Sequence, residues 1–285
     1  MTSAPSTLLV HNAYGKSEVR LTKIIRQPDH QEVKEISVNI ELEGDFSETY
    51  MSGDNSKVVA TDSMKNTVYA LAAQHPLDSI ESFANHLAKH FLKRYEQISQ
   101  ATVQLRESLW NRVVLNGNEH PHAFTSAGNE RRSAVVKATR ENTSIQSGIE
   151  NLVVLKTTNS EFWGFVRDEY TTLPETRDRI FATAIEATWA YGEDNPDFNK
   201  IYDAVRNIML EVFATHRSLS VQQTLYEMGR RALDACDRIE EITIRMPNQH
   251  HIAMNLTPFG LETKNEIFVP TDEPYGLITG TLRRP

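Results

Sequence analysis

The pattern of apolar residues along the chain constrains its fold most strongly, because one order of predicted elements occurs twice. In the first half, residues 35–42 alternate apolar and polar side chains, the pattern of a strand with one solvated face. The segment 18–26 precedes it across a turn-rich stretch, which predicts an antiparallel hairpin. Helices follow around 64–73 and 80–91, and two further strands flank a turn at 116–118. The first half therefore has the predicted order β-β-α-α-β-β.

The second half repeats this order. Its apolar residues alternate in some segments and recur at helical spacing in others. The predicted elements are strands at 133–139, 144–155, 241–246 and 254–256, with helices at 201–212 and 221–232 between them. The second half is again β-β-α-α-β-β.

Two tandem copies of this unit predict an α+β fold with domains at 1–130 and 131–285. Hairpins leave no crossover that would place helices on both faces, so each sheet should be antiparallel with its helices on one face. Two unrelated α+β domains remain an alternative from the pattern alone. Joining other copies of the chain edge to edge would remove exposed sheet edges, so an oligomer is plausible.

Charge and targeting signals exclude several classes of partner. The chain has 30 Lys and Arg against 38 Asp and Glu, a net charge of −8, which repels a nucleic-acid backbone. No stretch approaches the ~20 apolar residues of a membrane span, and the first residues do not form a signal peptide. The last residues, 282–285, are not a peroxisomal address. We therefore expect a cytoplasmic protein with no nucleic-acid or membrane partner.

The common cofactor and hydrolase signatures are absent from the sequence: there is no glycine-rich phosphate loop, no nucleophile elbow and no zinc-protease motif. His120 and His122 share a strand face, but no third His lies near them in sequence, and metal binding is not expected. The single cysteine, Cys236, is predicted to pack in the core.

Two polar segments are candidates for a site. Residues 60–67 lie between a strand-like run and a helix, and on composition alone they are best explained as a helix start with Asp62 or Ser63 as its cap. Residues 157–179 crowd aromatic, hydroxyl and charged side chains between a strand and a helix. A binding loop and a structural cover for the sheet edge are equally good explanations of this second segment.

These segments, together with Tyr14-Gly15-Lys16 and Pro247-Asn248-Gln249-His250, resemble the motifs of the urate oxidase (uricase) family. The resemblance extends over nearly the whole chain, and its Ala-Thr-Asp-Ser and Arg-Asp-Glu-Tyr-Thr-Thr-Leu segments are long and specific. It implies the tunnelling fold (T-fold), in which tandem β-β-α-α-β-β units form a homotetramer around a central tunnel. It also implies active sites that are shared between chains.

Carried over by position, Lys16, Thr61 and His250 resemble the catalytic relay of that family, with the first two from one chain and the third from its neighbour. A threonine hydroxyl can conduct a proton when a base touches it, and a partly desolvated lysine can lose its proton near neutrality. Histidine can exchange that proton at working pH. Without the resemblance, these positions would be explained as a surface lysine, a residue before a helix cap and a strand-end histidine. We select His250 over His251 because it stands two residues after Asn248.

The resemblance also implies a set of substrate contacts for a planar, electron-rich anion. A ring should stack on it, a guanidinium fork and an amide should grip its opposite edges, and backbone groups should complete the site. By position these are Phe162 for stacking, Arg179 and Gln222 for the edges, Val221 and Asp62 for backbone contacts, and Asn248 for holding oxygen or water.

The implied reaction is the oxidation of urate by O2 and water to 5-hydroxyisourate and hydrogen peroxide, with no flavin, haem or metal cofactor. Two alternatives differ in class. Another T-fold enzyme that processes purines or pterins would rely on zinc or a glutamate anchor, and neither is apparent. A non-catalytic purine-binding protein would bind urate without oxygen uptake.

Overall fold

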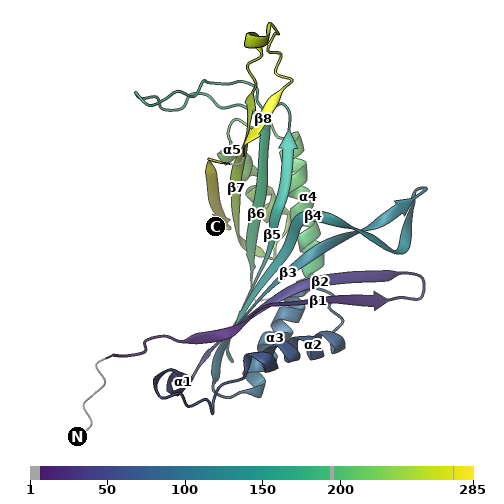
Figure 1. Ribbon diagram of the computed structural model, residues 1–285, viewed down its shortest axis with the longest axis vertical. Coiled ribbons are helices and arrows are strands. Elements are labelled where there is room, and N and C mark those ends of the chain that lie inside the picture. Colours follow the sequence, from purple (N-terminus) through teal and green to yellow (C-terminus); the bar gives the residue numbers. More distant parts are fainter. Residues whose placement is uncertain (1–6, 193–195, 272) are drawn as a thin grey trace. The chain divides into compact units, whose positions relative to one another are not determined.

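The computed structural model describes residues 7–192, 196–271 and 273–285, and its chain divides into two units, Met1–Ser147 and Gly148–Pro285 (Figure 1). The first unit contains β1 (Ala13–Arg26), β2 (Gln31–Gly44), α1 (Ser47–Met51), α2 (Thr61–Gln74), α3 (Ile80–Arg94), β3 (Ile98–Leu115) and β4 (Asn118–Ala138). The second contains most of β5 (Thr143–Lys156), then β6 (Phe181–Tyr191), α4 (Phe198–Thr215), α5 (Val221–Ala235), β7 (Ile239–Ala253), the 3-10 turn η1 (Thr257–Phe259), β8 (Phe268–Thr271) and β9 (Leu277–Arg283).

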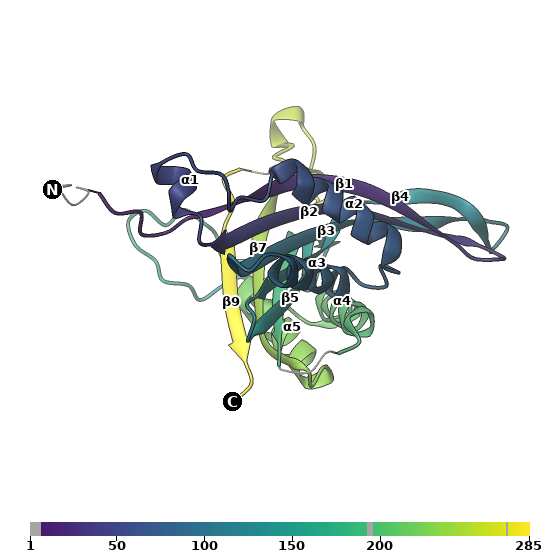
Figure 2. The ribbon, with the colours of Figure 1, turned by 90° about the horizontal axis from the view of Figure 1, so that it is seen from below.

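The sheet of the first unit is antiparallel from β1 through β4, and Figure 2 shows α2 and α3 on one of its faces. The alternation at 36–42 forms β2 as predicted, because Val38 and Leu42 are fully buried in the core while Asn39 and Glu41 face the other side. The apolar stripe of α3 covers this buried face. The predicted hairpins and helices of the first half are thus confirmed.

The second unit uses the same construction. In β7, Ile242, Ile244 and Met246 are fully buried and share a core cluster with Leu225 and Met228 of α5. β6 pairs with β7 in antiparallel register, and β9 and β8 pair with successive parts of the other edge of β7. Cys236 lies in this core, as predicted.

The two units also cap their first long helix with a lysine at an equivalent place. In the first unit, the Lys23 ammonium of β1 donates to the carbonyls of Ala72, at 2.8 Å, and His75 at the end of α2. In the second unit, the Lys156 ammonium of β5 donates to the carbonyl of His216 at the end of α4, at 2.7 Å. Both lysines meet the negative end of a helix dipole. β1 and β5 therefore have corresponding roles.

An arginine caps the second long helix of each unit. Arg140, after β4, donates to carbonyls at the end of α3, including that of Glu96 at 2.9 Å. Arg284, after β9, donates to carbonyls at the end of α5 and just beyond it, including those of Cys236 and Ile239 at 2.9 Å. The matched lysine and arginine caps support two copies of one structural unit.

We expect Arg284→Ala to lower the free energy of unfolding by about 2 kcal/mol, because several carbonyls at the end of α5 lose a charged donor. Arg283→Ala is a matched control one residue away, since Arg283 only forms an exposed ion pair with Glu241 at 2.9 Å. Urea unfolding of the two variants measures the difference. Equal effects at the two positions would show that Arg284 does not act as a helix cap.

Two sequence-based expectations about the region of β4 differ from the structure. The boundary expected between residues 130 and 131 falls inside β4, whereas the units divide between Ser147 and Gly148. The strand expected at 133–139 is the end of β4, which is one strand of 21 residues. Gly128 has a φ of 86° and the pairing of β3 with β4 shifts register nearby, so the interrupted alternation made one strand look like two.

The sequence analysis missed β6 and misplaced the last strand. β6 is rich in alanine, which has low strand propensity, so its pattern is weak until it is paired with β7. The strand expected at 254–256 does not form; β7 instead continues through Pro247 to Ala253, and the final strand is β9. In addition, α2 begins after Ala60 with no side-chain cap, so the expected cap at Asp62 or Ser63 is wrong.

Candidate active site

Lys16 lies on β1 at a point where the strand geometry is tightly constrained. A Cβ atom on the preceding Gly15 would come within 1.8 Å of the Ile40 carbonyl oxygen, so only glycine fits there without a backbone shift. The Tyr14 hydroxyl accepts a hydrogen bond from the Val59 N–H at 2.8 Å, which ties β1 to the segment before α2. Lys16, half-buried, is thereby brought to the start of α2.

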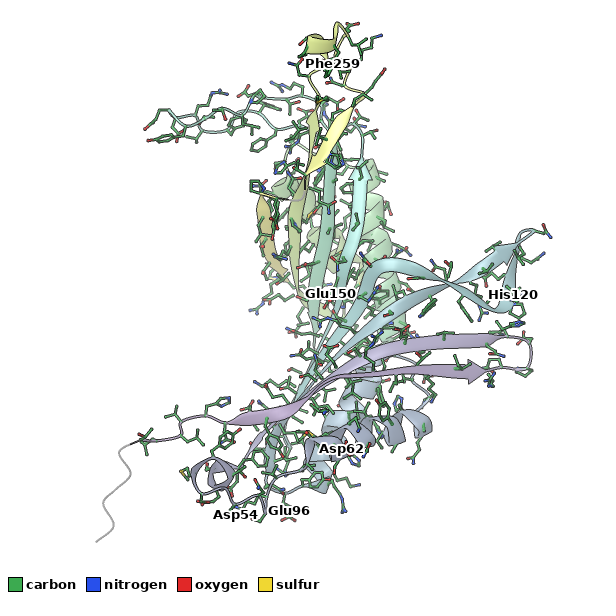
Figure 3. All side chains as sticks on the ribbon, in the orientation of Figure 1. Asp54, Asp62, Glu96, His120, Glu150 and Phe259 are labelled. Carbon is green, nitrogen blue, oxygen red and sulfur yellow. The ribbon has the colours of Figure 1, made fainter. Side chains whose placement is uncertain are left out.

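Thr61 is the first residue of α2, and Asp62 follows it in the first helical turn (Figure 3). A hydrogen bond from Lys65 lowers the pKa of the Asp62 carboxyl, and the charge of Lys16 lowers that pKa further. β1, which carries Lys16, and α2, which begins with Thr61 and Asp62, pack against each other within the first unit.

The second unit contains a pocket of about 800 Å³. Phe162 and Arg179 line it from the segment between β5 and β6, and Asn248 and His250 line it from β7. This volume falls in the range of small-molecule sites, about 300–1,000 Å³. Four of the predicted site residues thus meet in one cavity.

The Arg179 guanidinium lies 5.3 Å from the centre of the Phe162 ring. Its Nε atom is buried and meets no hydrogen-bond acceptor in the described part of the chain, and burial lowers the pKa of Arg179. Phe165 stacks on Phe162 with ring centres 4.9 Å apart and planes 14° from parallel. A half-buried cation with a buried, unused donor beside a flat ring is suited to a planar anion.

Asn248 and His250 are two and four residues after Met246 on β7. Because alternate residues of a strand point to the same face, both lie on the face that carries the buried Met246, beyond the core. The backbone N–H of Asn248 donates to the Gly276 carbonyl at 2.8 Å, which holds this part of the strand in place. His251 lies on the opposite face of the strand, and its Nδ1 is 3.3 Å from the Gln249 carbonyl oxygen. Both His250 and His251 line the pocket, and His250 is the one that shares the strand face of Asn248.

Val221 and Gln222 are the first residues of α5 and do not line this pocket. The Ser220 side chain accepts a hydrogen bond from the Gln223 N–H at 3.1 Å, which leaves the N–H groups of Val221 and Gln222 without partners in the helix. Such a helix start attracts anions. Val221 is buried, whereas the Gln222 side chain is exposed.

The segment that bears Phe162 lies against the start of α5. Glu161 N–H donates to the Ser218 carbonyl at 2.7 Å, and Ser218 N–H donates to the Asn159 carbonyl at 3.0 Å. Since Ser218 is three residues before Val221, the stacking ring and the helix start belong to one connected structure. Glu161 could not be predicted as part of this structure, because a charged residue in a polar segment resembles an ordinary solvated side chain.

No metal centre is found in the described residues: no three His, Cys, Asp or Glu side chains are placed to share an ion. The rings of His120 and His122 lie 4.5 Å apart between centroids in the outer part of the β3–β4 hairpin, where Figure 3 labels His120. None of the helices in the described ranges is long and apolar enough to cross a membrane.

Sequence comparison finds relatives along nearly the whole chain. The family model described as Uricase matches residues 12–137 and 145–279. A uricase from Arthrobacter globiformis is 43% identical over 277 residues, covering 97% of this chain and 90% of that protein. A uricase from Dictyostelium discoideum is 38% identical over 280 residues, covering 97% of each protein.

Structure comparison agrees. The crystal structure of uricase from Arthrobacter globiformis matches with a TM-score of 0.93 and 42% identity, covering 98% of this chain and 96% of that one. This likeness confirms the predicted α+β tunnelling fold. The roles of the individual site residues stay predictions, and the pocket and the cluster around Thr61 are the parts of the structure to which they apply.

Proposed function

Because this chain belongs to the uricase family, we propose that it oxidises urate with O2 and water to 5-hydroxyisourate and hydrogen peroxide. Urate gives up two electrons and O2 accepts them together with two protons, while water supplies the hydroxyl group of the product. The electrons pass from the ionised purine to oxygen, so the reaction needs neither a flavin nor a metal.

The observation that carries this proposal is Arg179. Its guanidinium lines the pocket with an unpaired buried Nε and lies beside the Phe162 ring, so it offers a planar fork next to a stacking surface. Urate is planar, anionic and rich in adjacent oxygen and nitrogen acceptors. Its binding would satisfy the guanidinium and gain aromatic stacking in one step.

The remaining contacts have roles that follow from their positions. The free N–H groups at the start of α5 favour the negative charge of urate, and Gln222 would grip the edge of the purine opposite Arg179. Asp62, in the first turn of α2, would add a backbone contact. Asn248, on the pocket wall, would hold oxygen or water above the ring.

Proton transfer is assigned to Lys16, Thr61 and His250. The Thr61 hydroxyl would relay a proton between the bound purine or water and the Lys16 amine, and His250 would take or return a proton at the other end. We further propose that Lys16 and Thr61 of one chain meet His250 of a neighbouring chain in a homotetramer. Such sharing would leave a single chain with only part of each site.

The test combines three measurements on purified, metal-stripped protein: urate absorbance, oxygen uptake and peroxide release. Consumption of urate and O2 in equal amounts, with one peroxide released per urate, is the expected result. A requirement for stoichiometric zinc would favour another T-fold enzyme instead. Tight urate binding without oxygen uptake would favour the purine-binding protein and refute the oxidase.

A further inference from the structure

Glu161 is the only acidic residue that is buried in the described part of the second unit. Its side chain is 2% exposed, and both carboxylate oxygens have cationic or polar partners. Arg217 Nε donates to Oε1 at 2.6 Å, and Trp163 Nε1 donates to Oε2 at 2.8 Å. Arg177 Nη1 lies 3.8 Å from Oε2. One carboxylate thus connects three separate stretches of the loop region.

Each of these stretches carries a residue of the proposed substrate site. Phe162 directly follows Glu161, Arg179 is two residues after Arg177, and Val221 is four residues after Arg217. The Arg177 guanidinium also lies 3.6 Å from the centre of the Trp163 ring, which adds a cation–π contact within the same cluster. A displacement of any one stretch would move its substrate contact relative to the other two.

Backbone bonds tie the stretch at Glu161 and Phe162 to each of the other two stretches. Phe162 and Thr176 exchange two backbone hydrogen bonds of 2.9 Å, and Glu161 N–H donates to the Ser218 carbonyl. These bonds join main chains, and the Glu161 carboxylate adds contacts to the side chains of both Arg177 and Arg217. The carboxylate thus reinforces, through side chains, the backbone frame that holds the stacking ring, the guanidinium and the start of α5.

We propose that Glu161 is a positioning residue for substrate binding: held by Arg217, Arg177 and Trp163, it aligns Phe162, Arg179 and the first turn of α5 around a planar anion. This inference rests on the proposed function, whose substrate it assumes. Glu161 itself does not line the pocket. Hydrogen bonds from Arg217 hold the pKa of Glu161 below its usual range, so the carboxylate remains ionised at the pH values of an assay.

The test is the kinetic behaviour of Glu161→Gln with urate. The amide keeps the size of the side chain but removes its charge, so the three stretches lose their common anchor. We expect the KM for urate to rise about tenfold with kcat within about twofold of the unsubstituted chain, since the binding contacts move while Lys16 and Thr61 are untouched. The pH profile of kcat should be unchanged. A role in stability alone would lower the melting temperature and leave KM as it was, which would overturn the proposal.

Further variants separate positioning from loss of folding. Arg217 is 71% exposed, so Arg217→Gln should fold even if Glu161→Gln does not, and it should raise KM in the same direction. The double variant should have a KM close to that of Glu161→Gln, because the two residues act as a unit. Additive effects of the two substitutions on KM would show that Glu161 and Arg217 act independently, which would contradict the proposal. Glu169→Gln, which changes an exposed carboxylate on the same loop, should leave KM unaltered.

The failure of this inference differs from the failure of the proposed function. If the unsubstituted chain does not oxidise urate, the proposed function is wrong whatever the variants do. If it oxidises urate and Glu161→Gln retains the original KM, only the positioning role is wrong. Trp163 fluorescence provides a readout besides activity: emission should shift in Glu161→Gln, because the indole N–H loses its carboxylate acceptor.

Discussion

Lys16→Met is expected to lower the kcat for urate oxidation by about 10²- to 10³-fold, because a positioned acid or base contributes rate on this scale. Methionine retains the unbranched stem and the packing of the lysine but cannot accept or donate a proton. Lys16 lies on β1, which packs against α2, and Thr61 is the first residue of α2, so we propose that the Thr61 hydroxyl passes the proton to the amine. Steady-state and single-turnover kinetics measure the change.

Affinity for urate should stay within about threefold in this variant, since the relay acts on the transition state rather than on the bound substrate. Thr61→Ala should have a comparable effect, and the double variant should be little slower than either single one. Lys89→Met is the matched control, because Lys89 is exposed on α3. A loss of binding as large as the loss of kcat would make Lys16 a substrate anchor instead of a proton carrier.

Arg179→Gln is expected to raise the KM for urate by about 100-fold, because charged hydrogen bonds contribute about 1.5–3 kcal/mol and the guanidinium provides a bidentate contact. Arg179→Lys should restore little of this affinity, since an ammonium cannot reproduce the planar fork. The structure adds an opposite expectation for stability. The Arg179 Nε is buried without an acceptor in the described chain, so Arg179→Gln should raise the melting temperature of the urate-free protein.

A gain in stability combined with a loss of affinity is expected of a binding residue that holds a buried, unpaired donor. Titration with urate should show the converse: it should stabilise the unsubstituted chain strongly and Arg179→Gln weakly. Arg283→Gln is the control, because Arg283 is exposed on β9 and remote in sequence from the pocket lining. A melting temperature that falls in Arg179→Gln would show that the guanidinium has a structural partner.

Local sequence patterns were sufficient to predict the strands and helices whose buried residues recur at a regular spacing without interruption. β2 and α3 could be predicted because each has one continuous apolar face, and a continuous face is encoded by residues within a few positions of one another. The same holds for α4, α5 and the first half of β7. The predicted order of elements was therefore largely correct, and so was the fold class.

The elements that were missed depend on partners distant in sequence. β6 is alanine-rich and forms a strand because β7 supplies its hydrogen bonds. β4 continues past an irregularity at Gly128 because β3 pairs with it on both sides. A single sequence contains no direct record of such pairings, so the boundary between the units could not be located from its pattern.

The same distinction, between what local patterns predict and what distant contacts decide, applies to the candidate site. The motifs supplied the kinds of residue and, through their resemblance to one family, a predicted relay and a predicted set of purine contacts. The placement of Phe162, Arg179, Asn248 and His250 in one pocket became visible in the folded chain, as did the contacts of Glu161 with the loops around it. Burial, an unpaired Nε and a shared carboxylate depend on atoms in contact, and these contacts join residues separated by tens of positions in the chain.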